Sequence, residues 1–304
     1  MDVREFRAST HGGWEYAQKS QTSKAGTFLA EWNGPECLIE WIKWDEGRVS
    51  GTYPASQDLI KESTAQYEKI FARLGKRADI SFVNMQNAQD YAICKLVPYT
   101  TVLDYGAGYA REAFLFMRDP IRYFATDAIE VPYMLQNWVL SAWPSFWEHF
   151  DHQPLRDERI GHLPTWELDR LPSIDLALFI WSLSEMSVHG AEHAMEKTMS
   201  KLSTGGHIYL RDNTSHGRFW DHHLIRCGFK PVYNPWKLSN AELHGVPRLY
   251  RYMPSYVNIG NMPFVKTAFT LWSSVMCSPR QWAVSLFRLL QNIKHTVRPF
   301  FGRS

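Results

Sequence analysis

Two aspartates and two glycines are spaced in the way that a nucleotide-binding turn requires. Asp104 lies near the end of the apolar run 101–105, and Gly106 and Gly108 follow it directly. Glycines let the backbone turn tightly and approach a ligand closely. Asp127 ends a second apolar run 23 residues later, where a carboxylate can accept both hydroxyls of a ribose. The spacing predicts a nucleoside held across the ends of two neighbouring strands.

Groups that can move a proton come after the later predicted strands. An alcohol becomes a good nucleophile only when a base removes its proton, and the reacting atoms must be aligned. Glu185 follows the apolar run 174–181 and is the first candidate to bind or deprotonate a hydroxyl. Asp212 and His216 come next, and His189 is a further candidate.

The segment from Asp104 to Ala110 resembles the first motif of class I S-adenosylmethionine-dependent methyltransferases, an acidic residue followed by Gly-x-Gly-x-Gly. Alanine stands at the third glycine position. A nicotinamide dehydrogenase would instead carry Gly-x-Gly-x-x-Gly. Arg111 occupies the last position of that pattern, and Asp104 precedes the turn, so both features favour the methyltransferase. The resemblance covers residues 101–253.

The resemblance implies S-adenosylmethionine as the cofactor and assigns its contacts. The loop 106–109 would contact the methionine part, Asp104 would lie near the amino group, and Asp127 would bind the ribose. Trp181 could pack against the adenine, although plain core packing explains it equally well. The cofactor-binding set is Asp104, Tyr105, Gly106, Ala107, Gly108, Asp127, Ala128 and Trp181.

The run Ser182-Leu183-Ser184-Glu185-Met186, with Asp175 heading its strand, is similar to bacterial sugar O-methyltransferases of this superfamily. That similarity implies methyl transfer to a hydroxyl of a sugar or glycan. Two alternatives stay open: a small-molecule O- or N-methyltransferase of a biosynthetic pathway, and a non-catalytic binding protein. Glu185, Asp212 and Asp221 with a histidine could supply ligands to a divalent metal, but no spacing demands one, so a metal is not favoured.

The elements that must position these residues alternate between short apolar strands and helical stretches. This alternation predicts a doubly wound α/β domain with a mostly parallel, seven-stranded, Rossmann-like sheet. The predicted strands are 101–105, 123–127, 174–181 and 206–212, one more between 143 and 170, and an antiparallel edge pair at 230–233 and 248–253. The predicted helices are a Trp-rich pair within 27–44, then 56–74, 84–96, 109–118, 131–142 and 190–202.

Three regions are expected along the chain. Residues 1–79 form a helical cap over the mouth of the site, 80–253 form the methyltransferase domain, and 254–304 form a helical extension. The composition of the 304 residues, 45% hydrophobic and 21% charged, is that of a globular protein. The four cysteines lie far apart, which argues against a structural zinc site or a disulfide framework. We expect a cytoplasmic protein, because neither a signal peptide nor a spanning apolar segment is recognisable.

The last 51 residues are basic. They carry six lysines and arginines and no acidic residue. Residues 281–294 present a broad apolar face, the pattern of a helix that lies on a membrane surface, here the inner face. The same face could pack on the domain or on a second subunit of a homo-oligomer. Nucleic acid is not expected as a partner, because no nucleic-acid-binding module accompanies the charge.

Overall fold

The computed structural model describes residues 32–49, 53–148, 159–186, 188–212, 220–221, 223–234 and 245–253. The chain divides into two compact units. One comprises residues 1–218 with 231–252, and the other comprises 219–230 with 253–304. The helices before residue 95 belong to the same unit as the strands that form the site. The three-region division at 79/80 and 253/254 stays a prediction.

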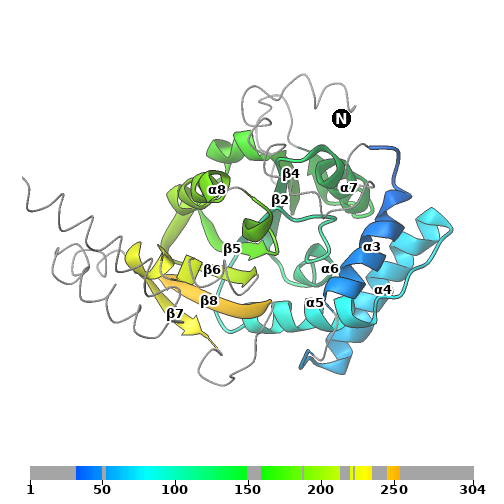
Figure 1. Ribbon diagram of the computed structural model, residues 1–304, viewed down its shortest axis with the longest axis horizontal. Helices are drawn as coiled ribbons and strands as arrows, with labels where there is room; N and C mark the ends of the chain where they lie inside the picture. The colour runs from blue at the N-terminus through cyan, green and yellow to red at the C-terminus, as the bar shows by residue number, and fades with distance from the viewer. Residues whose placement is uncertain are drawn as a thin grey trace, which may run out of the picture. The chain divides into compact units, whose positions relative to one another are not determined.

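Eight strands form one sheet within the described residues, in the order β3-β4-β2-β1-β5-β6-β8-β7 (Figure 1). β1 pairs in parallel with β2 and β5, and β6 pairs antiparallel with β8. The predicted doubly wound, mostly parallel sheet is therefore confirmed, and the short β3 adds an eighth strand beside β4. The strands are β1 Thr101–Tyr105, β2 Arg122–Asp127, β3 Phe146–Glu148, β4 Ile160–Pro164, β5 Ile174–Ile180, β6 Leu202–Asp212, β7 Phe229–Tyr233 and β8 Val246–Tyr252.

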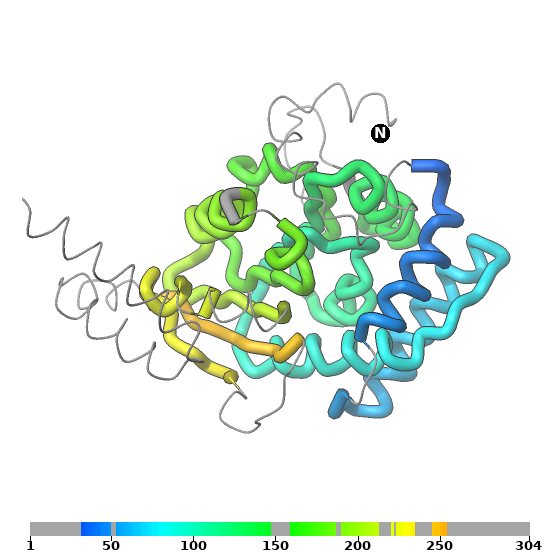
Figure 2. The backbone as a smooth tube through the Cα atoms, viewed as in Figure 1, coloured from blue at the N-terminus to red at the C-terminus, as the bar shows by residue number. Residues whose placement is uncertain are grey.

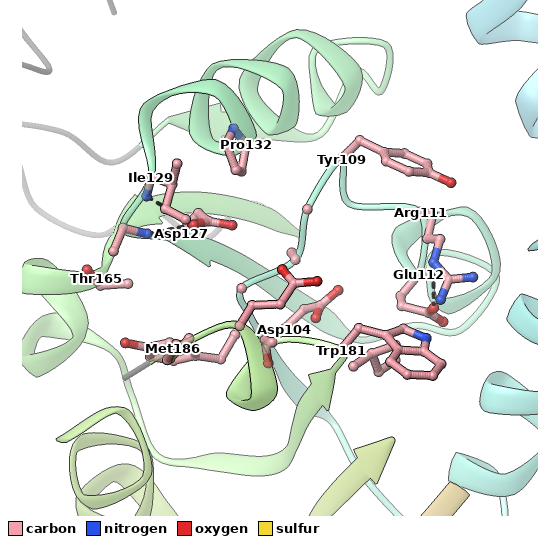
Figure 3. A pocket seen from close by; sticks show the side chains of 18 of the residues that line it. Asp104, Tyr109, Arg111, Glu112, Asp127, Ile129, Pro132, Thr165, Trp181 and Met186 are labelled. Atoms are coloured by element: carbon pink, nitrogen blue, oxygen red, sulfur yellow. Dashed lines mark hydrogen bonds and ion pairs between the residues drawn. The ribbon is translucent and has the colours of Figure 1, made fainter. Parts of the chain in front are cut away.

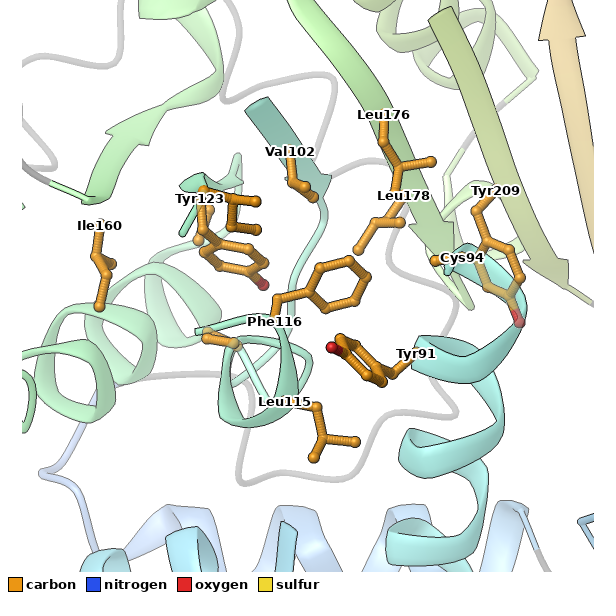
Figure 4. Close-up of a cluster of buried hydrophobic side chains, with 14 of the residues drawn as sticks. Tyr91, Cys94, Val102, Leu115, Phe116, Tyr123, Ile160, Leu176, Leu178 and Tyr209 are labelled. Carbon is orange, nitrogen blue, oxygen red and sulfur yellow. The ribbon is translucent and has the colours of Figure 1, made fainter. Parts of the chain in front are cut away.

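The central strands are apolar because helices cover both faces of the sheet. All five residues of β1 are buried, as expected for a parallel strand packed on both sides. Val102 of β1 and Leu176 and Leu178 of β5 join one hydrophobic cluster with Phe116 and Tyr91 from the helices (Figure 4). In the parallel register Asp104 lies opposite Ala125 of β2. The carboxyl ends of β1 and β2 therefore reach the same edge of the sheet.

Among the described residues, three helices precede the sheet and pack beside one another (Figure 2). α4 contacts α5 and α6, and α3 contacts α5. The predicted helix 56–74 is confirmed: the Ser56 hydroxyl caps its first turn, and Gly75 ends it with a φ of 64°. The helices are α3 Cys37–Arg48, α4 Gln57–Leu74, α5 Ser81–Cys94, α6 Ala113–Phe116, α7 Glu130–Leu140 and α8 Val188–Lys201, with 3-10 turns η2 Thr165–Arg170 and η3 Leu183–Glu185.

The helix expected over 109–118 is shorter than the sequence predicts. α6 covers only Ala113–Phe116. The reason is the backbone before it: Gly106, Gly108 and Ala110 have φ values of 68°, 60° and 57°. A residue in this left-handed region cannot belong to a right-handed helix, and an alanine there is strained. The alanine at the motif's third glycine position thus takes a glycine-like conformation.

Several predictions fall on residues outside those described. They concern the first part of the Trp-rich helical pair, His216, and the basic region 254–304 with its suggested membrane or subunit contact. No helix in the described part of the chain is long and apolar enough to cross a membrane.

Candidate functional site

A cavity of about 480 Å³ lies at the carboxyl ends of β1, β2, β4 and β5 (Figure 3). This volume is within the range of pockets that hold small molecules. Ligands of doubly wound sheets bind at this edge, beyond the strand ends. Helices α3, α7 and α8 and the 3-10 turn η2 complete the walls. α3 contributes Trp41, Trp44, Asp45 and Arg48, and α8 contributes Gly190, His193 and Lys197.

The glycine turn forms the floor of the cavity next to β1. The backbone N–H groups of Gly106 and Ala107 both donate to the Thr126 carbonyl of β2, at 2.9 and 3.2 Å. A Cβ at Gly106 would lie 2.6 Å from the Cβ of Ser182. Glycine is therefore required here both by the positive φ and by the close approach of the segment after β5.

Asp127 ends β2 and is 6% exposed. Its Oδ1 accepts the backbone N–H groups of Ala128 and Ile129, at 2.8 and 3.0 Å, and its Oδ2 accepts the Gln136 side-chain N–H at 3.2 Å. Burial raises the pKa of Asp127 to about 7, although the backbone donors oppose the shift. A carboxylate can accept about four hydrogen bonds, so Asp127 is fixed in place and can still accept from a ligand.

Asp104 lies on β1 and is 2% exposed. The Tyr123 hydroxyl donates to its Oδ2. Burial raises the pKa of Asp104 to about 7, and the Tyr123 hydroxyl and then the Arg111 guanidinium oppose that shift. Both predicted aspartates line the same cavity.

Glu185 lies at the end of η3, and about half of its side chain, 51%, is exposed. Arg48 of α3 donates from Nη1 to Glu185 Oε1 at 2.5 Å and from Nη2 to Asp45 Oδ1 at 2.6 Å. The guanidinium also lies 4.0 Å from the centre of the Trp44 ring, within cation–π distance. The surrounding protein raises the pKa of Glu185, and Arg48 opposes the shift. The Arg48 contact therefore holds Glu185 while half of the carboxylate-bearing side chain stays accessible.

Trp181 follows β5 with a φ of 59° and is 7% exposed. Its ring packs closely on the backbone of Gly245, where a Cβ would lie 2.3 Å from the ring. The indole N–H is buried and has no hydrogen-bond partner among the described residues. Trp181 lines the cavity, so the ring is a wall of the site as well as a core residue.

The structure places nine of the sequence-predicted residues in the cavity lining: Asp104, Tyr105, Gly106, Ala107, Gly108, Asp127, Ala128, Trp181 and Glu185. It does not place Asp212 there. Asp212 is 1% exposed, and its Oδ2 accepts the backbone N–H of Ser184 at 2.8 Å. Asp212 thus fixes the turn that carries Glu185. The side chain of His189 and all of His216 lie outside the described residues.

Sequence reasoning missed the α3 residues and the basic side chains of α8. No local motif connects Arg48 with Glu185, which is 137 residues away. The only signal was the density of tryptophan and charge between 41 and 48. His193 and Lys197 are four residues apart on α8, and both line the cavity. Basic residues four apart are common on surface helices, so this spacing by itself did not indicate a site. Within the described residues, no group of three or more His, Cys, Asp or Glu side chains could hold a metal ion.

No protein-family model and no curated protein match the chain. Solved structures with similar folds include a Burkholderia thailandensis 1,6-didemethyltoxoflavin N1-methyltransferase with bound S-adenosylhomocysteine (20% identity, 68% of this chain and 94% of that chain, TM-score 0.42). Another is an rRNA methylase from Streptococcus thermophilus (17%, 56% and 93%, TM-score 0.37). A third is an O-methyltransferase family protein from Burkholderia thailandensis (11%, 72% and 71%, TM-score 0.39).

Proposed function

We propose that the chain is an S-adenosylmethionine-dependent methyltransferase. The observation that carries the proposal is the joint placement of the glycine turn, Asp104 and Asp127 around one cavity at the strand ends. The residues present fit the cofactor. Asp127 keeps a buried carboxylate acceptor site for a ribose hydroxyl, and Ile129 and Pro132 supply apolar surface for a base. The left-handed turn at Gly106 and Gly108 lets a ligand approach the backbone closely.

Bound S-adenosylmethionine would supply a methyl group on a positively charged sulfur, ready for in-line displacement. The chain's own residues must then orient the acceptor and remove a proton. Glu185 is the base that the geometry supports best, because its carboxylate lies at the cavity and Arg48 fixes its position. Asp212 acts as a positioning residue through the backbone of Ser184.

We further propose that the acceptor is a hydroxyl of a sugar or glycan. Trp44 and Trp181 line the cavity near Glu185, and flat aromatic faces of this kind can pack on the apolar face of a sugar ring. Labelled S-adenosylmethionine can be incubated with free sugars, nucleotide sugars, phenols and amines. Label on a sugar supports the proposal, and label only on an amine or a phenol overturns the sugar assignment. Binding without transfer to any acceptor favours a binding protein.

Removal of the Asp127 carboxylate is expected to weaken cofactor binding. Asp127→Ala should lower the affinity for S-adenosylhomocysteine by about 1–3 kcal/mol, because hydrogen bonds to an ionised group are lost. Titration calorimetry measures the change. Asp58→Ala, on the exposed first turn of α4, serves as the matched control and should bind as the wild type does. Unchanged affinity in Asp127→Ala would contradict the ribose assignment.

Binding of a nucleoside should strengthen as the pH rises from 6 to 8. Burial raises the pKa of Asp127 to about 7, and the ionised carboxylate accepts a ribose hydroxyl better than the protonated form does. Below that pKa the ligand must displace a proton, so affinity falls by up to about tenfold per pH unit. The ligand 5′-methylthioadenosine, which has a ribose and no amino-acid part, reports on this end of the cavity. A flat pH profile in the wild type, or an equal slope in Asp127→Asn, would contradict the prediction.

A further inference from the structure

A buried glutamate in the cavity wall has no hydrogen-bond partner. Glu112 is 2% exposed and lines the cavity, and neither carboxylate oxygen accepts a hydrogen bond from the described residues. Arg111 Nε lies 3.6 Å from Oε1, which is longer than a hydrogen bond. A buried carboxylate without donors is costly, and such groups in folded proteins call for a specific explanation.

Arg111 forms an ion pair with Glu112 but donates no hydrogen bond to it. Arg111 directs its other donors elsewhere: Nη2 donates to Gln86 at 2.9 Å and Nη1 lies 3.5 Å from the Val83 carbonyl. Burial raises the pKa of Glu112 well above its ordinary value, opposed first by Arg111.

Further charges face Glu112 from three other elements. Asp90 of α5 and Asp104 of β1 raise the pKa of Glu112 further, and Arg211 of β6 lowers it. The two acidic neighbours therefore oppose ionisation of Glu112, and the two guanidinium groups favour it. None of the described residues donates a hydrogen bond to the carboxyl.

The cavity as a whole favours a cation. Its lining holds five carboxylic acids and three lysine or arginine side chains. All three cations are engaged in ion pairs: Arg48 with Asp45 and Glu185, Lys197 with Asp169, and Arg111 with Glu112 and Asp90. Asp127 is bonded by backbone N–H groups and Asp104 by a tyrosine hydroxyl. Glu112 alone among these acids accepts no hydrogen bond within the described structure.

We propose that Glu112 binds the α-ammonium group of the methyl donor's amino-acid part. This inference rests on the proposed function. It gives the amino-acid end of the cofactor a second carboxylate, Glu112, beside Asp104. An ammonium carries three N–H donors and a positive charge, which suit a buried carboxylate that has none. Glu112 lies four residues after Gly108, so one loop carries both the glycine turn and this group. Figure 3 shows Glu112 on the side of the cavity opposite Asp127, as an elongated ligand requires.

Two unpartnered hydroxyl or N–H donors in the same lining support an amino-acid ligand. Trp181 and Ser182 line the cavity, and the indole N–H and the hydroxyl are buried without hydrogen-bond partners among the described residues. An α-amino acid carries a carboxylate on the same carbon as its ammonium, and these donors suit that carboxylate. An amine of the acceptor would explain Glu112 but leave the two donors unused.

The test compares two ligands that differ in the amino-acid part. S-adenosylhomocysteine carries the ammonium, and 5′-methylthioadenosine lacks it. In the full chain, Glu112→Gln should weaken binding of S-adenosylhomocysteine about ten- to a hundredfold, because a charge-assisted contact is lost. Binding of 5′-methylthioadenosine should change less than about twofold, since the nucleoside does not reach Glu112. Glu130→Gln, at a buried glutamate that does not line the cavity, should leave both affinities unchanged.

The outcomes separate the inference from the function on which it rests. If the wild type binds both ligands and Glu112→Gln binds them as the wild type does, the ammonium site is wrong and the methyltransferase proposal stands. An equal loss for both ligands would show a structural role for Glu112 and would also overturn the inference. If the wild type binds neither ligand, the proposed function itself fails.

A measurement on the wild type covers the case in which Glu112→Gln does not fold. An ammonium beside Glu112 lowers the pKa of that carboxyl, which burial has raised, so a pH series of titrations with S-adenosylhomocysteine should show proton release on binding. Calorimetry in two buffers of different ionisation enthalpy counts that proton. Release should exceed the release with 5′-methylthioadenosine, and equal release with both ligands overturns the inference.

Discussion

Replacement of Asp90 by alanine is expected to lower the free energy of unfolding by about 3–5 kcal/mol, because it leaves a buried arginine without its partner. Asp90 of α5 and Arg211 of β6 are both fully buried. Arg211 Nε donates to Asp90 Oδ1 at 2.6 Å, and the Tyr209 hydroxyl donates to the same oxygen. Arg211 also donates to the Gly245 carbonyl at 2.6 Å, which lies against the ring of Trp181. The loss should therefore extend from the core to the wall of the cavity.

Urea denaturation followed by circular dichroism measures this loss of stability. The matched control is Glu68→Ala, which removes a surface ion pair with Arg77 whose side chains are 40% and 76% exposed. This control substitution should lower the free energy of unfolding by less than about 1 kcal/mol. The double variant Asp90→Ala/Arg211→Met should recover part of the loss, because it removes the unpaired charge as well. A cost for Asp90→Ala no larger than that of the control would contradict the role of the buried pair.

Glu185→Gln is expected to lower turnover about 100- to 10,000-fold, the usual contribution of a general base. Glutamine has nearly the same shape and can still accept from Arg48, but it cannot take a proton. The affinity for S-adenosylhomocysteine should stay within about twofold of the wild type, because the amide keeps the packing of η3. The readout is single-turnover transfer to whichever acceptor the wild type methylates, alongside calorimetric binding.

The control and a pH profile decide how Glu185 acts. Glu40→Gln, on the exposed face of α3 and paired only with Lys43 in the described structure, should leave turnover unchanged. Arg48 lowers the pKa of Glu185, so Arg48→Met should move the acid limb of the turnover profile to higher pH. Full turnover in Glu185→Gln would place the base elsewhere. A loss of turnover with an equal loss of cofactor affinity would point to a structural role.

The amino-acid sequence by itself determined the central strands of the sheet and the position of the turn, whereas it did not locate β3 and β4, and β6 begins at Leu202, four residues before the predicted start. β1 lies at 101–105 as predicted, and β2 and β5 agree to within one residue at each end. A strand that is buried on both faces must consist of a short run of apolar residues. Such a run can be recognised from neighbouring residues in the sequence. The glycine turn and Asp127 were predictable for the same reason, because strand ends and turns depend on residues close together in the chain.

Only the tertiary structure decided which distant side chains share the cavity. Arg48 meets Glu185 because Trp41 of α3 packs on Tyr109, with ring centres 5.9 Å apart, and docks that helix beside the glycine turn. Glu112 is buried because the chain takes left-handed turns at Gly106, Gly108 and Ala110 before α6 begins. Contacts of this kind depend on how separate elements pack. A sequence pattern reflects only local periodicity and turn residues. The charged side chains across the cavity meet because elements more than a hundred residues apart pack with complementary shapes.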